Sequence, residues 1–233
     1  MSDVVIRQAR LEDIPFIAKV IVEAEKSGTE HAVMARYFGI TDEELKKYIE
    51  QVLEEEVDGC ELSLGGFFVA DYEGRPVSAQ GGWMEGAHDG MRSEVLKSNL
   101  LMHVFPKEII LATREKSEMA RDLHIERELG AYQLEYSFTD PDFRGQHLVQ
   151  RCMLEHLKKA KYEYHASKVQ VHILEKNLPN VKAKERLGFY VAKRYVSNNP
   201  RVLEFYPSNV LLLMEADVNS LQLSGCGFRR GGN

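Results

Sequence analysis

The sequence has few cysteines and no long apolar run. Its three cysteines, Cys60, Cys152 and Cys226, are odd in number and far apart in a chain of 233 residues. No two have the spacing of a metal-ligand pair, and a disulfide framework would need more of them, so we expect a reducing compartment, the cytoplasm. No apolar run approaches the roughly 20 residues of a membrane helix. Residues 1–4 lack the basic region and apolar core of a secretory signal, so we expect no membrane association.

Concentrated positive charge is missing as well. The formal net charge is −6, and no long block of Lys and Arg stands out. Tight non-specific binding of nucleic acid needs many cationic contacts to phosphates, so we expect no nucleic-acid partner. His103 and His124 have no paired ligand spacing, which argues against a metal site.

The composition is that of a folded globular chain. Hydrophobic residues make up 44% and charged residues 28% of the sequence. The length suits one sizeable core, and we expect a single domain over residues 1–216. The remaining segment, 217–233, is rich in Gly and Ser, and we expect it to be a flexible tail.

Hydrophobic periodicity predicts an alternation of strands and helices. Strand-like segments occupy residues 4–9, 67–72, 77–84, 131–138, 168–174, 189–195 and 209–216. Helical patterns begin at residue 11, run from 41 to about 57, lie around 94–103 and 106–129, and run from about 147 to 162 and from 177 to 187. Thr41 and Glu44 form a capping box at the start of the second helix. The order predicts an α/β fold with a mixed sheet of about seven strands, flanked by helices and carrying a helical insertion at 86–130.

The junction at residues 138–149 is the first candidate for chemistry. A strand ends there, a turn containing Pro141 and Gly145 follows, and a helix begins. Such a turn presents unpaired backbone N–H groups at the positive end of the helix dipole, which suits a phosphate-bearing ligand. Many such turns bind nothing, so the junction alone does not decide between a ligand site and an ordinary turn.

A second segment follows some thirty residues downstream. Residues 177–189 begin with Asn177 and end in the pair Gly188 and Phe189, with a strand on either side. The two segments together resemble the GNAT superfamily of acyl-CoA N-acyltransferases. The family's first motif has the form (hydrophobic)-x-Pro-x-(aromatic)-Arg-Gly-x-Gly-x-Gly, and its second has the form Asn-x-x-Ala-x-x-x-Tyr-Glu-x-Leu-Gly-Phe. The resemblance covers about residues 4–85 and 131–216.

The resemblance implies an enzyme that transfers an acetyl group from acetyl-CoA, its cosubstrate, to a primary amine by direct attack, without a metal. It implies a GNAT-like, mostly antiparallel sheet in which the cofactor strand splays from the next strand. The pantetheine arm would pair with the strand at Phe138 and Thr139, and Asn177 would contact the cofactor. The pyrophosphate would sit on the backbone amides of Arg144, Gly145, Gln146, His147, Leu148 and Val149.

The sequence departs from the family pattern at two places. His147 and Val149 replace the second and third glycines of the phosphate loop, and their β-carbons limit how closely a diphosphate approaches. Lys184 replaces the tyrosine that frequently protonates the departing thiolate. A lysine at its reference pKa of about 10.4 is a weak acid, so Lys184 is either a catalytic acid with a shifted pKa or a plain surface residue. Tyr190 is a nearby alternative acid.

The general base is sought among carboxylates near the cofactor slot. Glu135, on the strand beside that slot, is the first candidate, and Glu85, at the end of the preceding hairpin strand, is the second. For each of them a solvated carboxylate at a strand edge is the competing interpretation.

The long insertion is the expected determinant of acceptor choice. A long connection inside a compact domain is usually functional, so residues of 86–130, including His103, Arg114 and Glu118, are expected to set specificity. The acceptor itself stays open between a small amine and a peptide or protein amine, and a homodimer is a further open alternative. The same motifs also fit a non-catalytic acyl-CoA-binding or regulatory module, or a structural domain that kept only the fold.

Overall fold

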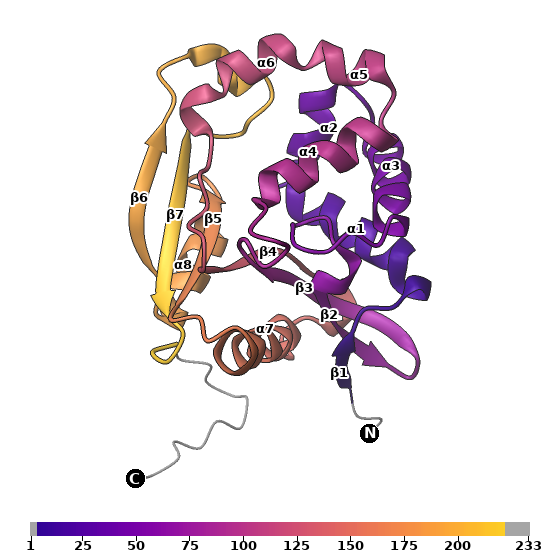
Figure 1. The fold of residues 1–233 in the computed structure, drawn as a ribbon, viewed down its shortest axis with the longest axis vertical. Coiled ribbons are helices and arrows are strands. Elements are labelled where there is room, and N and C mark those ends of the chain that lie inside the picture. The colour runs from indigo at the N-terminus through magenta and orange to yellow at the C-terminus, as the bar shows by residue number, and fades with distance from the viewer. Residues whose placement is uncertain (1–3, 222–233) are drawn as a thin grey trace.

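The computed structural model describes residues 4–221, which form one seven-stranded mixed sheet with helices on both faces (Figure 1). The strands are β1 (Val5–Gln8), β2 (Phe67–Tyr72), β3 (Arg75–Met84), β4 (Tyr132–Thr139), β5 (Lys168–Leu174), β6 (Tyr190–Val196) and β7 (Val210–Asp217). Their order across the sheet is β1-β2-β3-β4-β5-β7-β6. Each neighbouring pair is antiparallel except β4 and β5, which are parallel. The expected fold class is confirmed.

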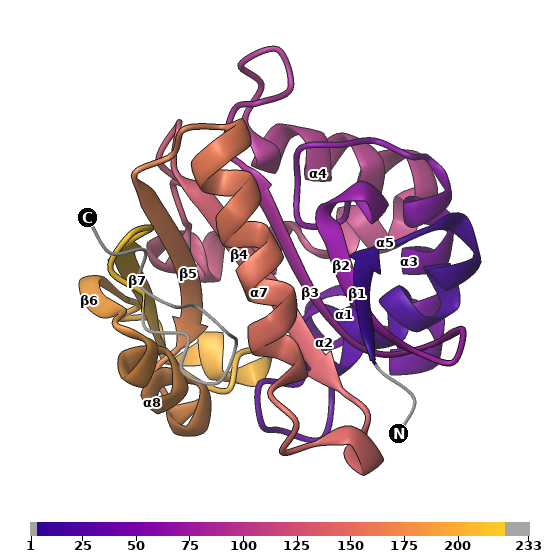
Figure 2. The ribbon, with the colours of Figure 1, turned by 90° about the horizontal axis from the view of Figure 1, so that it is seen from below.

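Helices cover the two faces of the sheet unequally. Helix α1 (Ile14–Glu25) packs on β4 and on α3 (Asp42–Glu54), whereas α7 (Leu148–Lys158) packs on β2 and β3 from the other side (Figure 2). The capping box of α3 forms as expected, because the Thr41 hydroxyl accepts from the Glu44 N–H and Glu44 accepts from the Thr41 N–H. Apolar residues along α1, including Ile17 and Ile21, are fully buried, which fixes this helix to the sheet.

The C-terminal half has its own core. Helix α8 (Leu178–Leu187) buries Val181 and Leu187 against apolar side chains of β5 and β7, such as Val171 and Met214. The strand β7 is buried along nearly its whole length, in keeping with its run of leucines. The two cores are joined through the central pair β4 and β5, where the sheet forks.

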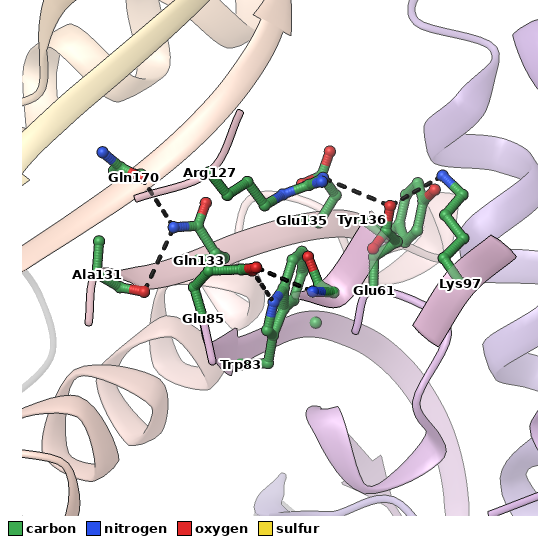
Figure 3. Close-up of polar contacts among 12 residues, drawn as sticks. Glu61, Trp83, Glu85, Lys97, Arg127, Ala131, Gln133, Glu135, Tyr136 and Gln170 are labelled. Atoms are coloured by element: carbon green, nitrogen blue, oxygen red, sulfur yellow. Dashed lines mark hydrogen bonds and ion pairs between the residues drawn. The ribbon is translucent and has the colours of Figure 1, made fainter. Parts of the chain in front are cut away.

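The fork arises because β4 and β5 pair over only two residues. Tyr132 lies opposite Val169 and Gln133 opposite Gln170, and no further pair follows along these strands. At the vertex the Gln133 side-chain amide donates to Gln170 (Figure 3). The Gln170 amide in turn donates to Glu215 on β7. Beyond the vertex the edge of β4 that faces β5 has no strand partner within residues 4–221, which agrees with the splay that the resemblance implies.

The insertion differs from the two helices expected. Helix α4 (Ser93–Val104) is present, but the predicted helix at 106–129 is wrong in its length. The structure has two short helices there, α5 (Lys107–Ala112) and α6 (Arg114–Met119), and a 3₁₀ turn, η3 (Arg121–Leu123). Thr113 separates the two helices, and its hydroxyl donates to the Ile110 carbonyl, a local bond that competes with helix continuation.

A short helix, α2 (Val33–Phe38), is present that the sequence did not predict, because six residues are too few to show a helical period. None of the helices within residues 4–221 is long and apolar enough to cross a membrane. Most of the expected flexible tail, from residue 222 onward, lies outside the described residues, as does Cys226.

Candidate functional site

A cavity of about 820 Å³ occupies the fork between β4 and β5. Its walls include residues of β4, β5, the end of α1, the region around α8, and the insertion. The sequence places the cofactor slot at this fork.

A β-bulge in β4 shapes the floor of this cavity. Gly81 lies opposite Glu135 and Gln80 opposite Ser137, so Tyr136 is the extra residue, and its φ of 43° is left-handed. The Gln80 side chain donates to the Glu135 carbonyl at 2.6 Å and holds the bulge. In a regular strand, neighbouring side chains point to opposite faces, whereas here both Glu135 and Tyr136 line the cavity.

Glu135 belongs to a chain of ion pairs between buried and half-buried side chains (Figure 3). The Nη2 group of Arg127, from the insertion, lies 3.2 Å from the Glu135 carboxylate and 3.4 Å from that of Glu61. Lys97, from α4, donates to the same Glu61 carboxylate at 2.8 Å. The guanidinium of Arg127 also stacks on Trp83, 5.0 Å from the ring centre. The insertion therefore supplies both cations of this group.

The two carboxylates of this group differ in acidity. Burial alone would raise the pKa of Glu61, but Arg127 and Lys97 together lower it to about 2. For Glu135 burial prevails, and it raises the pKa of this carboxyl despite the Arg127 charge. A carboxylate whose pKa is raised is a better proton acceptor, so Glu135 has the character of a general base and Glu61 that of a fixed anion.

Lys184 reaches the cavity from α8. Its side chain is buried and lines the cavity. Among the described residues, its ammonium makes one close contact, a cation–π contact with the Phe189 ring, whose centre is 5.7 Å from Nζ. Burial lowers the pKa of Lys184 to about 8, with Glu135 acting weakly in the other direction. Lys184 is thus not a plain surface residue, and it is a stronger acid than an ordinary lysine. The alternative acid, Tyr190, is exposed, does not line the cavity, and donates to Glu215.

Glu85 lies apart from this cavity. Its carboxylate accepts hydrogen bonds from the Trp83 indole at 3.0 Å and from the Ser93 N–H at 2.9 Å. It is buried and fastens the start of α4 to the end of β3. The structure thus gives Glu85 an anchoring role and does not bring this second candidate base to the cavity wall.

The expected phosphate turn is exposed and open. Gly145 has a φ of 79° and His147, just before α7, a φ of 56°, so the chain turns sharply into the helix. Residues Arg144, Gly145, Gln146 and His147 are exposed, Val149 is half-buried, and Leu148 is buried under the helix. The N–H groups at the start of α7 have no partners within the helix and remain available to an anion.

The other expected cofactor residues divide into two groups. Arg144 and Asn177 line the cavity. Phe138 and Thr139 lie where β4 pairs with β3 but not with β5, and they are not part of the cavity wall. The Phe138 ring lies 5.0 Å from the Lys19 ammonium, and the Thr139 hydroxyl lies 2.7 Å from that of Ser78.

The insertion lines the cavity, but not with the residues that were expected. His103, Arg114 and Glu118 are exposed and lie outside it. The insertion residues that do line it are Glu94, Lys97, Ser98, Leu123, His124, Ile125 and Arg127. The sequence carries no local signal for Lys97 or Arg127, because their partner Glu61 lies far away along the chain.

His172, on β5, is a further residue that the sequence did not indicate. It lines the cavity opposite β4, and neither ring nitrogen has a hydrogen-bond partner among the described residues. Burial lowers its pKa to about 3, so the imidazole is neutral at physiological pH. Among residues 4–221 no group of three or more His, Cys, Asp or Glu side chains is arranged to hold a metal ion.

Comparison with known proteins gives matches in structure and none in sequence. No protein-family model matches the chain, and no curated protein matches its sequence. An N-acetyltransferase from Staphylococcus aureus Mu50 matches with a TM-score of 0.64 at 15% identity, covering 91% of this chain and 100% of that one. A polyamine N-acetyltransferase of Drosophila melanogaster that forms N-acetylagmatine matches with a TM-score of 0.53 at 14% identity, covering 92% and 100%.

A third solved structure contains the acyl donor. The Salmonella typhimurium protein yncA, in a structure with its cofactor acetyl-CoA, matches with a TM-score of 0.50 at 12% identity, covering 93% of this chain and 95% of that one. At these identities the likeness establishes the fold, so what the site does has to be argued from its own residues.

Proposed function

The chain has the GNAT acyltransferase fold, and from that premise we propose that it transfers an acetyl group from acetyl-CoA to a primary amine by direct attack. The observation that carries this proposal is the cavity at the fork, where a carboxylate with a raised pKa sits beside the unpaired edge of β4. The structural neighbours include named N-acetyltransferases and one structure with acetyl-CoA, which supports the choice of acyl donor.

The residues present fit acetyl-CoA as the donor. The exposed turn at Gly145 and the N-terminus of α7 offer backbone N–H groups for the pyrophosphate. Arg144 and Asn177, both in the cavity wall, supply a charge and an amide beside them. The free edge of β4 offers N–H and C=O groups to the amide-containing pantetheine arm, as an added strand would pair with a sheet edge.

In the proposed reaction Glu135 accepts a proton from the acceptor ammonium, directly or through a water molecule. The neutral amine then attacks the thioester carbonyl, and backbone N–H groups of β4 stabilise the resulting oxyanion. The nitrogen of this intermediate still carries one proton too many and loses it to water. Collapse then breaks the carbon–sulfur bond, forms the amide and expels the thiolate. Lys184, with a pKa of about 8, donates a proton to the departing thiolate.

A non-catalytic acyl-CoA-binding module is the second candidate. The observation that favours it is the phosphate turn itself, where His147 and Val149 stand in place of glycines. The two candidates differ in one measurable respect, because both bind acetyl-CoA and only the enzyme releases its thiol in the presence of an amine.

The test combines binding and turnover in Glu135→Gln. We expect calorimetry to show saturable binding of acetyl-CoA, and not of ATP, to the natural chain and to the variant alike. Thiol release with a panel of primary amines should fall by roughly 10²–10⁴ in the variant, because the base is gone. Glutamine keeps a hydrogen-bond acceptor for Arg127, so the fold should persist.

The matched control is Glu118→Gln, an exposed carboxylate outside the cavity, which should leave turnover unchanged. Full activity in Glu135→Gln would remove this residue from the mechanism. Binding of acetyl-CoA without thiol release for any amine would favour the non-catalytic module, and no binding at millimolar concentration would contradict both candidates.

A further inference from the structure

The inner end of the cavity holds an electrically balanced group of four side chains. The anions are Glu61 and Glu135 and the cations are Lys97 and Arg127, so the formal charges cancel (Figure 3). Taking a charge out of water is costly unless it is paired. A bare ammonium entering this end would leave one uncompensated positive charge, whereas a molecule that carries an anion as well would preserve the balance.

The cations of this group keep donors that have no partner. Among the described residues, Arg127 uses only Nη2 for hydrogen bonds, and its buried Nε has no partner. The Arg127 side chain is 9% exposed. Lys97 makes one hydrogen bond, to Glu61, with an ammonium that can make three. The Lys97 side chain is 28% exposed and lines the cavity, so its remaining donors are open to a ligand, and a guanidinium beside an ammonium suits a carboxylate.

The other carboxylates of the wall are already engaged. Glu23 accepts from Lys26 at 2.7 Å, and Glu94 lies 3.2 Å from His124. Glu25 accepts from the Tyr136 hydroxyl and from a backbone N–H. Within the charged group itself, the buried Glu61 Oε2 also has no hydrogen-bond partner among the described residues, but it is not exposed to the cavity. The open groups that a ligand can reach beside Glu61 are the remaining donors of Lys97, which favours an anionic group on the ligand.

A buried apolar cluster, which we call the apolar joint, limits the size of a ligand that can enter the cavity. Val33 of α2, Leu123 of η3 and Leu211 of β7 belong to one buried cluster and also form part of the cavity wall. Phe205, 1% exposed, lies at the centre of this cluster. Polar ties accompany it, since Arg36 donates to the Glu204 carbonyl at 2.8 Å and Arg201 pairs with Glu115 at 2.7 Å. Figure 1 shows α5 and α6 running above the fork toward β6 and β7.

We propose that the acceptor is a small amine that also carries a carboxylate, bound with its amine at Glu135 and its carboxylate on Lys97 and Arg127. The cavity has the volume of a pocket for one drug-sized ligand and has to hold the pantetheine arm as well. A protein substrate would have to displace the apolar joint to enter the cavity at the end where this joint lies. This inference rests on the proposed acetyl transfer and names its substrate class.

The test compares matched acceptors that differ only in the carboxylate. Thiol release is measured for glycine against methylamine, β-alanine against ethylamine, and γ-aminobutyrate against propylamine. The quantity of interest is the ratio of kcat/KM within each pair, because any effect on the base or on acetyl-CoA cancels in it. For the preferred pair we expect a ratio of at least about tenfold, the value of one charge-assisted hydrogen bond.

The variant Lys97→Met tests whether the carboxylate of the acceptor binds at Lys97. This variant should lower the ratio toward one mainly through a higher KM for the amino acid. Any effect of the lost charge on Glu135 acts on both members of a pair and cancels in the ratio. Lys46→Met, on the surface of α3 where Lys46 pairs with Glu50, is the matched control and should leave the ratio unchanged. Because the ratio in the natural chain needs no variant, the inference stays testable even if Lys97→Met does not fold.

Three outcomes would overturn the inference. A ratio near one in every pair would exclude carboxylate recognition, and a high ratio that survives in Lys97→Met would place it elsewhere. A peptide acetylated faster than any small amine would exclude the size limit. Failure of the proposed function itself looks different, because then neither member of any pair releases thiol.

Discussion

Lys184 shows at the residue scale how burial creates chemical character. An exposed lysine is fully protonated at neutral pH, but burial away from carboxylate partners lowers this pKa to about 8. The same burial has an energetic cost. Below about pH 8 the folded chain has to hold a buried, poorly compensated ammonium, whereas the unfolded chain keeps that charge in water.

We predict that stability near Lys184 rises with pH. Between about pH 8 and 10.5 the folded state has lost this proton while the unfolded chain keeps it, so the free energy of unfolding increases with pH. Relative to Lys184→Met, the natural chain should gain up to about 3 kcal/mol across this window, from a shift of about 2.5 pKa units. Urea unfolding at pH 7 and pH 10 measures the difference.

Lys182→Met is the control for this prediction, because Lys182 is exposed on the same helix. Its difference from the natural chain should not change with pH. A constant difference for Lys184→Met as well would contradict the lowered pKa.

The turn between β4 and α7 carries the functional argument at the scale of elements. Its two left-handed residues, Gly145 and His147, direct the chain into α7, and its exposed amides are the proposed seat of the pyrophosphate. Gly145 has open space around the position that a β-carbon would take, so a larger side chain meets no steric obstacle there. What a larger side chain disturbs is the backbone, because a β-branched residue disfavours a φ of 79°.

We predict that Gly145→Val weakens acetyl-CoA binding without unfolding the chain. Straining the turn costs roughly 1–2 kcal/mol, which should raise the calorimetric Kd about tenfold. Gly74→Val is a matched control: Gly74 has a φ of 82° and equally open surroundings, but lies in the turn between β2 and β3. If Gly74→Val weakens binding to the same extent, or Gly145→Val leaves it unchanged, the cofactor is placed wrongly.

At the scale of the whole molecule, the insertion joins the two halves of the forked sheet. The buried cluster around Phe205 connects α2 with η3, with the η6 turn (Pro200–Glu204) and with β7. Phe205 contacts the rings of Tyr37 and Tyr206, at 5.7 and 5.2 Å between ring centres. The fork itself pairs over two residues only, so this joint braces the end of the cavity that the sheet leaves open.

We predict that Phe205→Ala lowers the free energy of unfolding by about 3–5 kcal/mol, the cost of deleting a buried aromatic ring. Amide hydrogen exchange should accelerate in α6 and in α2 together, because both helices contribute residues to this buried cluster. The control is Leu203→Ala in the same turn, where the side chain is 43% exposed and the change should stay within about 0.5 kcal/mol. Acceleration confined to residues 200–206 would show that the joint does not brace the insertion.

The sequence by itself determined the elements and the backbone motif of this protein. The periodicity of the strands, the capping box at Thr41 and the turn at Gly145 are local, and each is set by neighbours a few residues apart. Glu135 could be proposed from its place on the strand beside the slot, and the structure places it in the cavity wall. The helix predicted at 106–129 was wrong in its length. Side-chain hydrogen bonds such as that of Thr113 interrupt the helix, although the sequence pattern is continuous there.

Only the tertiary structure decided the character of the cavity. The bulged residue Tyr136 is not a glycine, so the sequence gives no sign of the bulge. The bulge depends on the hydrogen bond that the Gln80 side chain, from the neighbouring strand, donates to the Glu135 carbonyl. The charged group forms because Arg127 meets a carboxylate 66 residues earlier in the chain. Burial raises the pKa of both Glu61 and Glu135, but Arg127 and Lys97 together outweigh it at Glu61 and not at Glu135, so two identical side chains differ in acidity. A pKa and an open hydrogen-bond donor are properties of surroundings assembled from distant segments, and local sequence patterns do not encode them.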